Sequence, residues 1–277
     1  MTMVQKCMVM IEGTKQKEET YGKIVAAWDD AKTGQTITIV QPNDMGGRSL
    51  EKTLMALFPD ATSDSRNKAR YITLTKSDYI HEKTKEILIE WRRYNELTFV
   101  DTIGFYSMPG IFGWDKVDKG SMILCDHLDK LKGIVADFGC GYGYLSHFSL
   151  AKFEEIEQLY AIDIDPKAVA ATRKNIVNSR AKIIEGDCTK IIPDLPQCDV
   201  IIMNPPFHNG SSEDKKLGQD FIKTASHHLK KSGVLFMVAN AHLPYEKILK
   251  SEFPILEKLF EGHGFKIFKT SFVPVTK

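Results

Sequence analysis

Apolar and polar residues follow one another in the second half of the chain in blocks that predict strands and helices in turn. Short apolar runs are typical of buried strands, and they occupy residues 134–138, 158–162, 181–185, 198–203 and 233–239. The segments between them have a helical period and predict helices near 120–131, 143–152, 166–178 and 217–231. Strands and helices that alternate in this order form a parallel sheet with helices on both faces.

The first hundred residues carry a weaker version of the same pattern. It predicts strands at 4–12, 36–40 and 71–75 and helices at 21–31 and 50–57. The polar stretch 60–70 predicts a loop, and the charged, helix-like segment 78–100 predicts a link to the second half. We therefore expect two domains, residues 1–100 and residues 101–277.

Two segments of the first half resemble two segments near the C-terminus. AKTGQTITIVQPN (31–43) is similar to KKSGVLFMVAN (230–240), and RYITLTKS (70–77) is similar to FKIFKTSF (265–272). One interpretation is a duplicated half-domain. The alternative is that any two α/β sheets look alike at this level.

One apolar run ends in an unusual loop, IIMNPPFH (201–208). Each proline fixes its own φ, lacks an N–H and pushes the preceding residue into an extended conformation. The pattern predicts a stiff loop that presents the Asn204 amide, the carbonyls of Pro205 and Pro206, and the Phe207 ring. Such a surface can hold a planar group that bears an NH2, and His208 could contact a phosphate or accept a proton.

Three earlier strand ends also carry polar groups suited to a ligand. Asp137 precedes a glycine-rich loop with Gly139, Cys140 and Gly141, where the backbone can turn tightly and approach a ligand. Asp163 ends the next strand, where a carboxylate accepts hydrogen bonds from ribose hydroxyls. Asp187 follows the third strand and could accept from an adenine amine. Each carboxylate alone could be a helix cap, but polar groups at successive strand ends predict a binding site.

Composition narrows the class of protein. No apolar run approaches the length of a membrane helix, and the N-terminus has no signal-peptide pattern. The five cysteines form no CxxC pair, which indicates reduced thiols in a cytoplasmic protein without a metal site. The net charge of +1 predicts no binding of nucleic acid by bulk charge.

Taken together, the strand-end residues resemble a class I S-adenosylmethionine-dependent methyltransferase. PGIF (109–112), NPPFHNG (204–210) and VANAHLPY (238–245) resemble, more closely, the ribosomal RNA small-subunit methyltransferase C family, and ITIVQPNDMGGRSLEKTL (37–54) resembles its N-terminal domain. The resemblance implies a Rossmann-like catalytic domain with an antiparallel strand near the C-terminus. A smaller, truncated and degenerate α/β domain, matching only the later part of a methyltransferase fold, would precede it.

The resemblance also implies an activity: methylation of a guanine N2 amine in 16S rRNA of the small ribosomal subunit, by a monomer, with S-adenosyl-L-methionine as cofactor. Asp137, Gly139, Cys140, Gly141, Asp163, Asp187 and Asn204 would then bind the cofactor. Asn204 and Pro205 would hold the amine, while Phe207 would stack on a base taken out of its helix. Three alternatives stay open: methylation of a protein glutamine, methylation of adenine N6, and nucleotide binding without catalysis.

Overall fold

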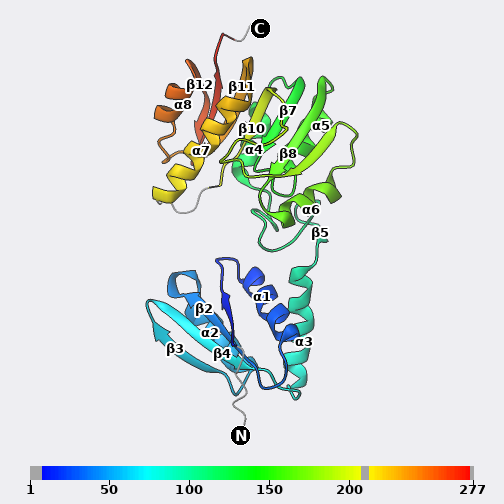
Figure 1. The fold of residues 1–277 in the computed structure, drawn as a ribbon, viewed down its shortest axis with the longest axis vertical. Helices are drawn as coiled ribbons and strands as arrows, with labels where there is room; N and C mark the ends of the chain where they lie inside the picture. The colour runs from blue at the N-terminus through cyan, green and yellow to red at the C-terminus, as the bar shows by residue number, and fades with distance from the viewer. Residues whose placement is uncertain (1–7, 207–211, 275–277) are drawn as a thin grey trace. The chain divides into compact units, whose positions relative to one another are not determined.

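The computed structural model describes residues 8–206 and 212–274 (Figure 1). The chain divides into two compact units, which are described separately. The N-terminal unit comprises Met1–Thr98 and Met108–Gly110, and the C-terminal unit comprises Phe99–Ser107 and Ile111–Lys277.

A seven-stranded sheet forms the centre of the C-terminal unit, in the order β12-β13-β11-β10-β7-β8-β9. The five parallel strands are β7 (Gly133–Phe138), β8 (Ile156–Asp163), β9 (Ala181–Glu185), β10 (Cys198–Met203) and β11 (Leu229–Asn240). Strand β13 (Phe265–Ser271) is antiparallel to β11, and β12 (Ile255–Gly262) is antiparallel to β13. The expected antiparallel strand near the C-terminus is thus confirmed.

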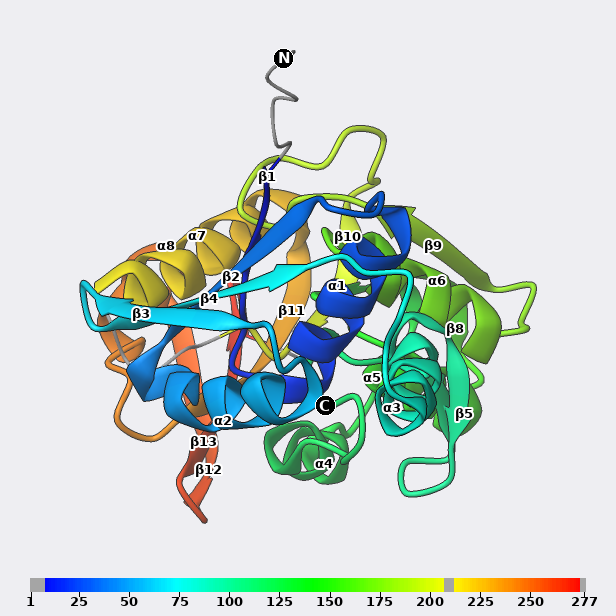
Figure 2. The ribbon, with the colours of Figure 1, turned by 90° about the horizontal axis from the view of Figure 1, so that it is seen from below.

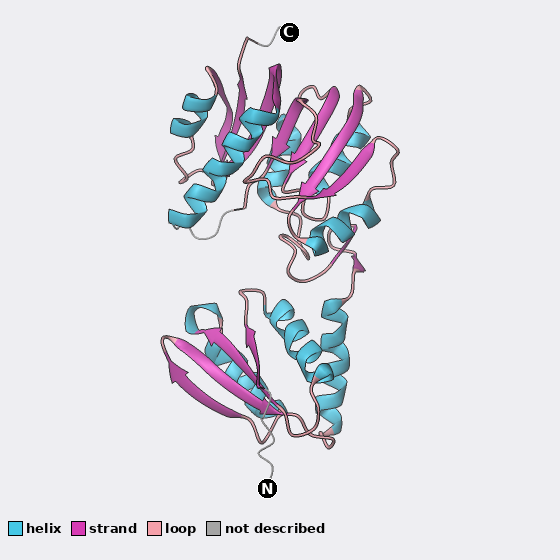
Figure 3. Cartoon of the chain, viewed as in Figure 1, coloured by secondary structure: helices cyan, strands magenta, loops and turns pink. Residues whose placement is uncertain are grey.

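Helices cover both faces of this sheet (Figure 3). Alternate residues of each strand enter different cores: Phe138 and Met203 pack with α7 (Ser212–His228) and α8 (Glu246–Glu252). Val135 and Ile202 pack with α4 (Lys119–His127) and α5 (Tyr144–Lys152), on the face that α6 (Pro166–Asn175) also joins through Ile176. This two-sided burial explains why the inner strands β7 and β10 are largely apolar in sequence, and it confirms the expected α/β class.

The N-terminal unit has a four-stranded sheet in the order β1-β2-β4-β3. Its elements are β1 (Met8–Glu12), α1 (Lys17–Asp30), β2 (Thr36–Pro42), α2 (Gly47–Leu57), β3 (Thr62–Arg66), β4 (Ala69–Thr75) and α3 (Glu82–Arg92). Ile37, Ile39, Ile72 and Leu74 are fully buried with the three helices, which lie along one face of the sheet (Figure 2).

The connectivity of this small unit matches that of the last four strands of the C-terminal unit. In both, two parallel strands joined by a helix are followed by a helix and an antiparallel hairpin, whose second strand pairs with the sheet. The correspondence is β1 to β10, β2 to β11, β3 to β12 and β4 to β13, with the same strand directions. Shared connectivity of this length supports the duplication interpretation.

One local expectation was wrong: the predicted loop at 60–70 contains strand β3. All five residues of β3 are exposed, so no apolar pattern marks it. It is held as an edge strand by pairing with β4, and Asn67 and Lys68 both adopt positive φ in the two-residue turn between them. Turns of this kind match the twist of a hairpin. The pattern also missed the short hairpin β5 (Thr98–Val100) and β6 (Phe105–Ser107).

Candidate functional site

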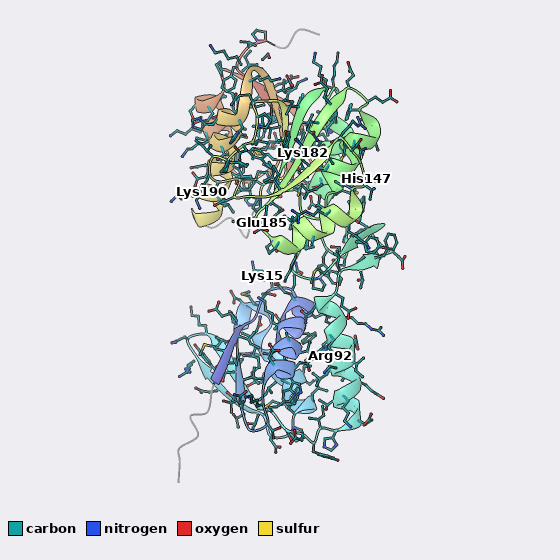
Figure 4. The ribbon with its side chains drawn as sticks, turned by 45° about the vertical axis from the view of Figure 1, so that its right-hand side comes forward. Lys15, Arg92, His147, Lys182, Glu185 and Lys190 are labelled. Carbon is teal, nitrogen blue, oxygen red and sulfur yellow. The ribbon has the colours of Figure 1, made fainter. Side chains whose placement is uncertain are left out.

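The strand register brings three of the expected site residues to one level of the C-terminal sheet. Phe138 pairs with Met203 on one side and with Ile162 on the other. The next residues along these strands are Asn204, Gly139 and Asp163. Neighbouring strands are about 4.8 Å apart, so these residues lie within reach of one ligand, at the point where the strand order reverses. Such points are where open α/β sheets bind ligands. Glu185, which pairs with Asp163, lies at the same edge (Figure 4).

The loop after β7 is shaped by glycines. Gly139, Gly141 and Gly143 all have positive φ, a backbone conformation that residues other than Gly rarely adopt. The amides of Gly139 and Cys140 both donate to the Ile162 carbonyl, at 2.8 and 2.9 Å. A Cβ at Gly141 would meet no atom of the described residues within 4 Å. The loop is therefore tied to β8 and leaves open space above Gly141.

Asp137 lies beneath this loop and is fully buried. Its Oδ2 accepts a 2.6 Å hydrogen bond from Ser146 Oγ, while Oδ1 has no partner within the described residues. Burial raises the pKa of Asp137 to about 7, and the nearby Asp163 carboxylate adds to that rise. A buried acceptor without a partner is costly. A cationic or hydrogen-bond-donating ligand group would offset that cost.

Asp163 organises the glycine loop as well as facing the ligand space. Its Oδ2 accepts from the Gly141 amide at 2.8 Å, and its Oδ1 accepts from the Asp165 amide at 2.9 Å. Burial raises its pKa above the ordinary value, against the effect of these hydrogen bonds. Each carboxylate oxygen has a second lone pair, so the group can still accept from two hydroxyls.

Asp187 has the opposite electrostatic environment. Its Oδ1 accepts from Thr189 N and Oγ1, and its Oδ2 forms an ion pair with Lys190 Nζ at 2.8 Å. The hydrogen bonds from Lys190 and then Thr189 lower the pKa of Asp187 to about 2. Lys190 is exposed (Figure 4), so its side chain can move and free an oxygen for a ligand amine.

Cys140 presents no thiol to solvent. The residue is buried, and its Sγ lies 3.6 Å from Thr172 Oγ1. Burial raises the pKa of the Cys140 thiol well above its ordinary value, so the group stays protonated. Any role of Cys140 toward a ligand would come from its backbone.

Asn204 is held by two groups on a different segment. Its Nδ2 donates to Asp118 Oδ2 at 2.8 Å and to Ser121 Oγ at 2.9 Å. Among the amides and side chains that the structure describes, none donates a hydrogen bond to its Oδ1. Pro205 is buried and Pro206 half-buried, whereas Phe207 and His208 lie outside the described residues.

Several residues of the site escaped the sequence interpretation: Asp118, Ser121, Ser146, Thr172 and Thr189. Asp118 could have been found, because an acidic residue three positions before Ser121 and next to an expected helix is an N-cap signal. Its contact with Asn204, 86 residues away, has no counterpart in the local pattern.

Comparison with known proteins places this geometry in a family. Residues 102–269 match the methyltransferase small domain. The ribosomal RNA small subunit methyltransferase C of Haemophilus influenzae (strain PittGG) is 30% identical over 268 residues, which cover 95% of this chain and 79% of that protein. The chain belongs to the ribosomal RNA small subunit methyltransferase C family. The member from Salmonella newport (strain SL254) is 33% identical over 262 residues, which cover 92% of this chain and 73% of that protein.

A solved structure with the family's name shares the fold. It is the T. Thermophilus 16S rRNA N2 methyltransferase RsmC in complex with AdoMet and guanosine, which matches with a TM-score of 0.76 at 21% identity. The match covers 95% of this chain and 72% of that one. Within the described residues, no helix is long and apolar enough to cross a membrane, and no group of His, Cys, Asp or Glu is arranged to hold a metal ion.

Proposed function

We propose that the chain transfers a methyl group from S-adenosyl-L-methionine to the N2 amine of a guanine in 16S rRNA. Membership of the methyltransferase C family supports the reaction class. One observation carries the choice of acceptor: Asn204 turns its NH2 toward Asp118 and Ser121, and no hydrogen bond from the part of the chain that the structure describes reaches its Oδ1. An oxygen in that position accepts from an N–H group, so the side chain suits an amine.

The cofactor would be held by the ends of β7, β8 and β9. The orphan Oδ1 of Asp137 and the open space above Gly141 fit a ligand with a cationic end. Gly139 and Cys140 contribute backbone, Asp163 accepts from the ribose hydroxyls and Asp187 from the adenine amine. When bound, S-adenosylmethionine supplies the methyl group: the amine lone pair forms the N–C bond, the C–S pair stays on sulfur, and nitrogen loses a proton to solvent.

The acceptor would be held by the loop after β10. A guanine N2 lone pair is delocalised into the ring and is a poor nucleophile until it is aimed at the methyl carbon. Asn204 Oδ1 and the Pro205 carbonyl accept its two N–H bonds, which orients the lone pair and stabilises developing positive charge. Pro206 stiffens the loop, Phe207 stacks on the flipped base, and His208 contacts the RNA.

The partner would be the small ribosomal subunit, and a ribosomal substrate implies action in the cytoplasm. We expect a monomer. The N-terminal unit, expected at residues 1–100, would be a degenerate copy of the methyltransferase fold. Its described residues have counterparts of β10 to β13, and the loop after β1, Gly13-Thr14-Lys15, has no Asn-Pro-Pro, so we expect these residues to hold no methyl acceptor.

One experiment tests the reaction and its alternatives together. The protein is incubated with methyl-labelled S-adenosylmethionine and undermethylated small subunits, and RNA and protein are then separated. Digestion of the RNA to nucleosides should give labelled N2-methylguanosine. Label in N6-methyladenosine, or in protein as methylglutamine, would instead favour one of the alternative acceptors, and no transfer at all would favour a binding module.

A further inference from the structure

The Asn204 amide is held in a single orientation by its neighbours. An Asn side chain can rotate so that its oxygen and nitrogen exchange places, and its orientation is assigned from its partners. An ionised carboxylate only accepts hydrogen bonds, so the atom 2.8 Å from Asp118 Oδ2 has to be Nδ2. Ser121 Oγ accepts the second proton at 2.9 Å.

The two partners are themselves fixed in place. Asp118 is the N-cap of α4, and the same Oδ2 accepts from the Ser121 amide at 2.7 Å. Gly120 lets the segment close up: a Cβ there would lie 2.9 Å from Phe265 Cε1 and 3.1 Å from Asp118 Oδ2. Ser121 is buried. We call Asp118 and Ser121 the amide clamp.

The clamp decides which end of the Asn204 amide faces the acceptor. If the amide were reversed, its NH2 would point at the N–H bonds of the methyl acceptor, donor against donor. The ionised Asp118 also polarises the amide, which makes Oδ1 a stronger acceptor for an amine that gains positive charge. We propose that Asp118 and Ser121 are positioning residues that restrict this site to acceptors presenting an N–H group. This inference rests on the proposed function.

The first test separates the clamp from the helix cap. Asp118→Ser keeps an N-cap oxygen but is too short to hold the Asn204 amide. Asp118→Asn can still accept from both Ser121 N and Asn204 Nδ2 through its Oδ1, without the charge. Ser121→Ala removes one acceptor and leaves Asp118 in place. The control is Asp129→Ser, an exposed acid just beyond the other end of α4, paired with Lys269.

The readout is single-turnover methylation at saturating cofactor, beside cofactor titration and urea unfolding. Asp118→Ser and Ser121→Ala should slow transfer by about 10- to 100-fold, the cost seen when a group that orients a metal ligand is removed. Asp118→Asn should recover much of that loss, and Asp129→Ser should match the wild type. Cofactor affinity should change less than twofold in all four. Transfer at the wild-type rate in Asp118→Ser and Ser121→Ala would overturn the proposal.

The second test needs no activity. In protein labelled with 15N-asparagine, the Asn204 NH2 signal is assigned by its loss in Asn204→Asp. Its two protons should exchange slowly with solvent in the wild type and faster in Asp118→Ser. If the two proteins show the same exchange rate, the proposed role of the amide clamp is wrong, even if Asp118→Ser transfers the methyl group slowly. If the clamp signals behave as expected but wild-type protein methylates no RNA, the proposed function fails and the clamp does not.

Discussion

Asp137 and Asp187 stand at the same edge of one sheet, yet their surroundings shift their pKa values in opposite directions. Asp137 is fully buried, and because burial disfavours the charged form, its pKa rises to about 7 despite the hydrogen bonds from Ser146. Asp187 faces Lys190 and solvent, so the charged form is favoured and the pKa falls to about 2. Burial and charge partners thus give two identical side chains different protonation states near neutral pH.

The raised pKa of Asp137 predicts a pH dependence of stability. Its folded-state value exceeds the ordinary 3.8, so its contribution to stability is complete below about pH 4 and is lost as pH rises to about 7. Asp137→Asn removes this dependence. Urea unfolding without cofactor should therefore show the variant gaining on the wild type between pH 5 and pH 8. A difference between the two proteins that is the same at both pH values would contradict the assignment.

Asn204 is the residue whose loss should affect chemistry more than binding. Asn204→Ala removes the acceptor for the amine, while the other groups proposed for the cofactor, at the ends of β7, β8 and β9, stay in place. Removing one preorganised polar partner of a transition state costs roughly 10²–10³ in kcat. Single-turnover methylation should slow by that order, and the cofactor dissociation constant should change little. If the variant methylates as fast as the wild type, the loop after β10 is structural.

At the scale of elements, the apolar pattern predicts what is buried and misses what is paired only by backbone. The parallel strands were predictable from their apolar runs, which in β7, β10 and β11 reflect burial on both faces; the edge strand β9 keeps such a run although none of its residues is fully buried. Strand β3 was not, since its sequence TSDSR has no apolar residue to bury. Strand β12, ILEKLFEG, is amphipathic at a helical spacing and is fixed by its hairpin with β13. The polar residues at the strand ends predicted that Asp163 and Asn204 lie at one edge of the sheet. Contacts between distant segments, such as that of Asp118 with Asn204, can be found only from the fold.

A larger residue in the glycine loop should impair cofactor binding more than it impairs folding. Gly141 has φ of 57°, so Gly141→Val strains the backbone by about 1–3 kcal/mol, but its Cβ lies within 4 Å of no atom of the described residues. The Val side chain would instead fill the space proposed for the cofactor. Calorimetry should show no cofactor binding by a folded variant.

Gly34→Val is the matched control for that loop. Gly34 also has positive φ and open space around it, but it belongs to the N-terminal unit, which contributes no residue to the proposed site. The Gly34→Val variant should lose about as much stability as Gly141→Val and keep full cofactor affinity. Equal affinity in both variants would mean that the cofactor lies elsewhere.

At the scale of the whole molecule, the two units share a connectivity but differ in their ligand groups. The loop after β10 is Asn204-Pro205-Pro206, whereas the loop after β1 is Gly13-Thr14-Lys15. The described part of the N-terminal unit also lacks counterparts of β7 to β9, which carry the glycine loop, Asp163 and Asp187. The described strands of this unit keep a core, since its helices cover Ile37 and Ile39, and none of them carries the groups proposed here to bind the cofactor.

This asymmetry predicts where the cofactor changes hydrogen exchange. Binding at about 100 times the dissociation constant stabilises the bound state by about 2.7 kcal/mol. Amides that open locally near the ligand should therefore exchange more slowly, at residues 139–146, 163–167 and 187–190. Residues 8–98 should exchange at the same rate with and without cofactor, measured by mass spectrometry of peptides. In Gly141→Val the protection should disappear from all three segments. Protection of the N-terminal unit in the wild type would reveal a second cofactor site and would refute the view of that unit as a degenerate copy.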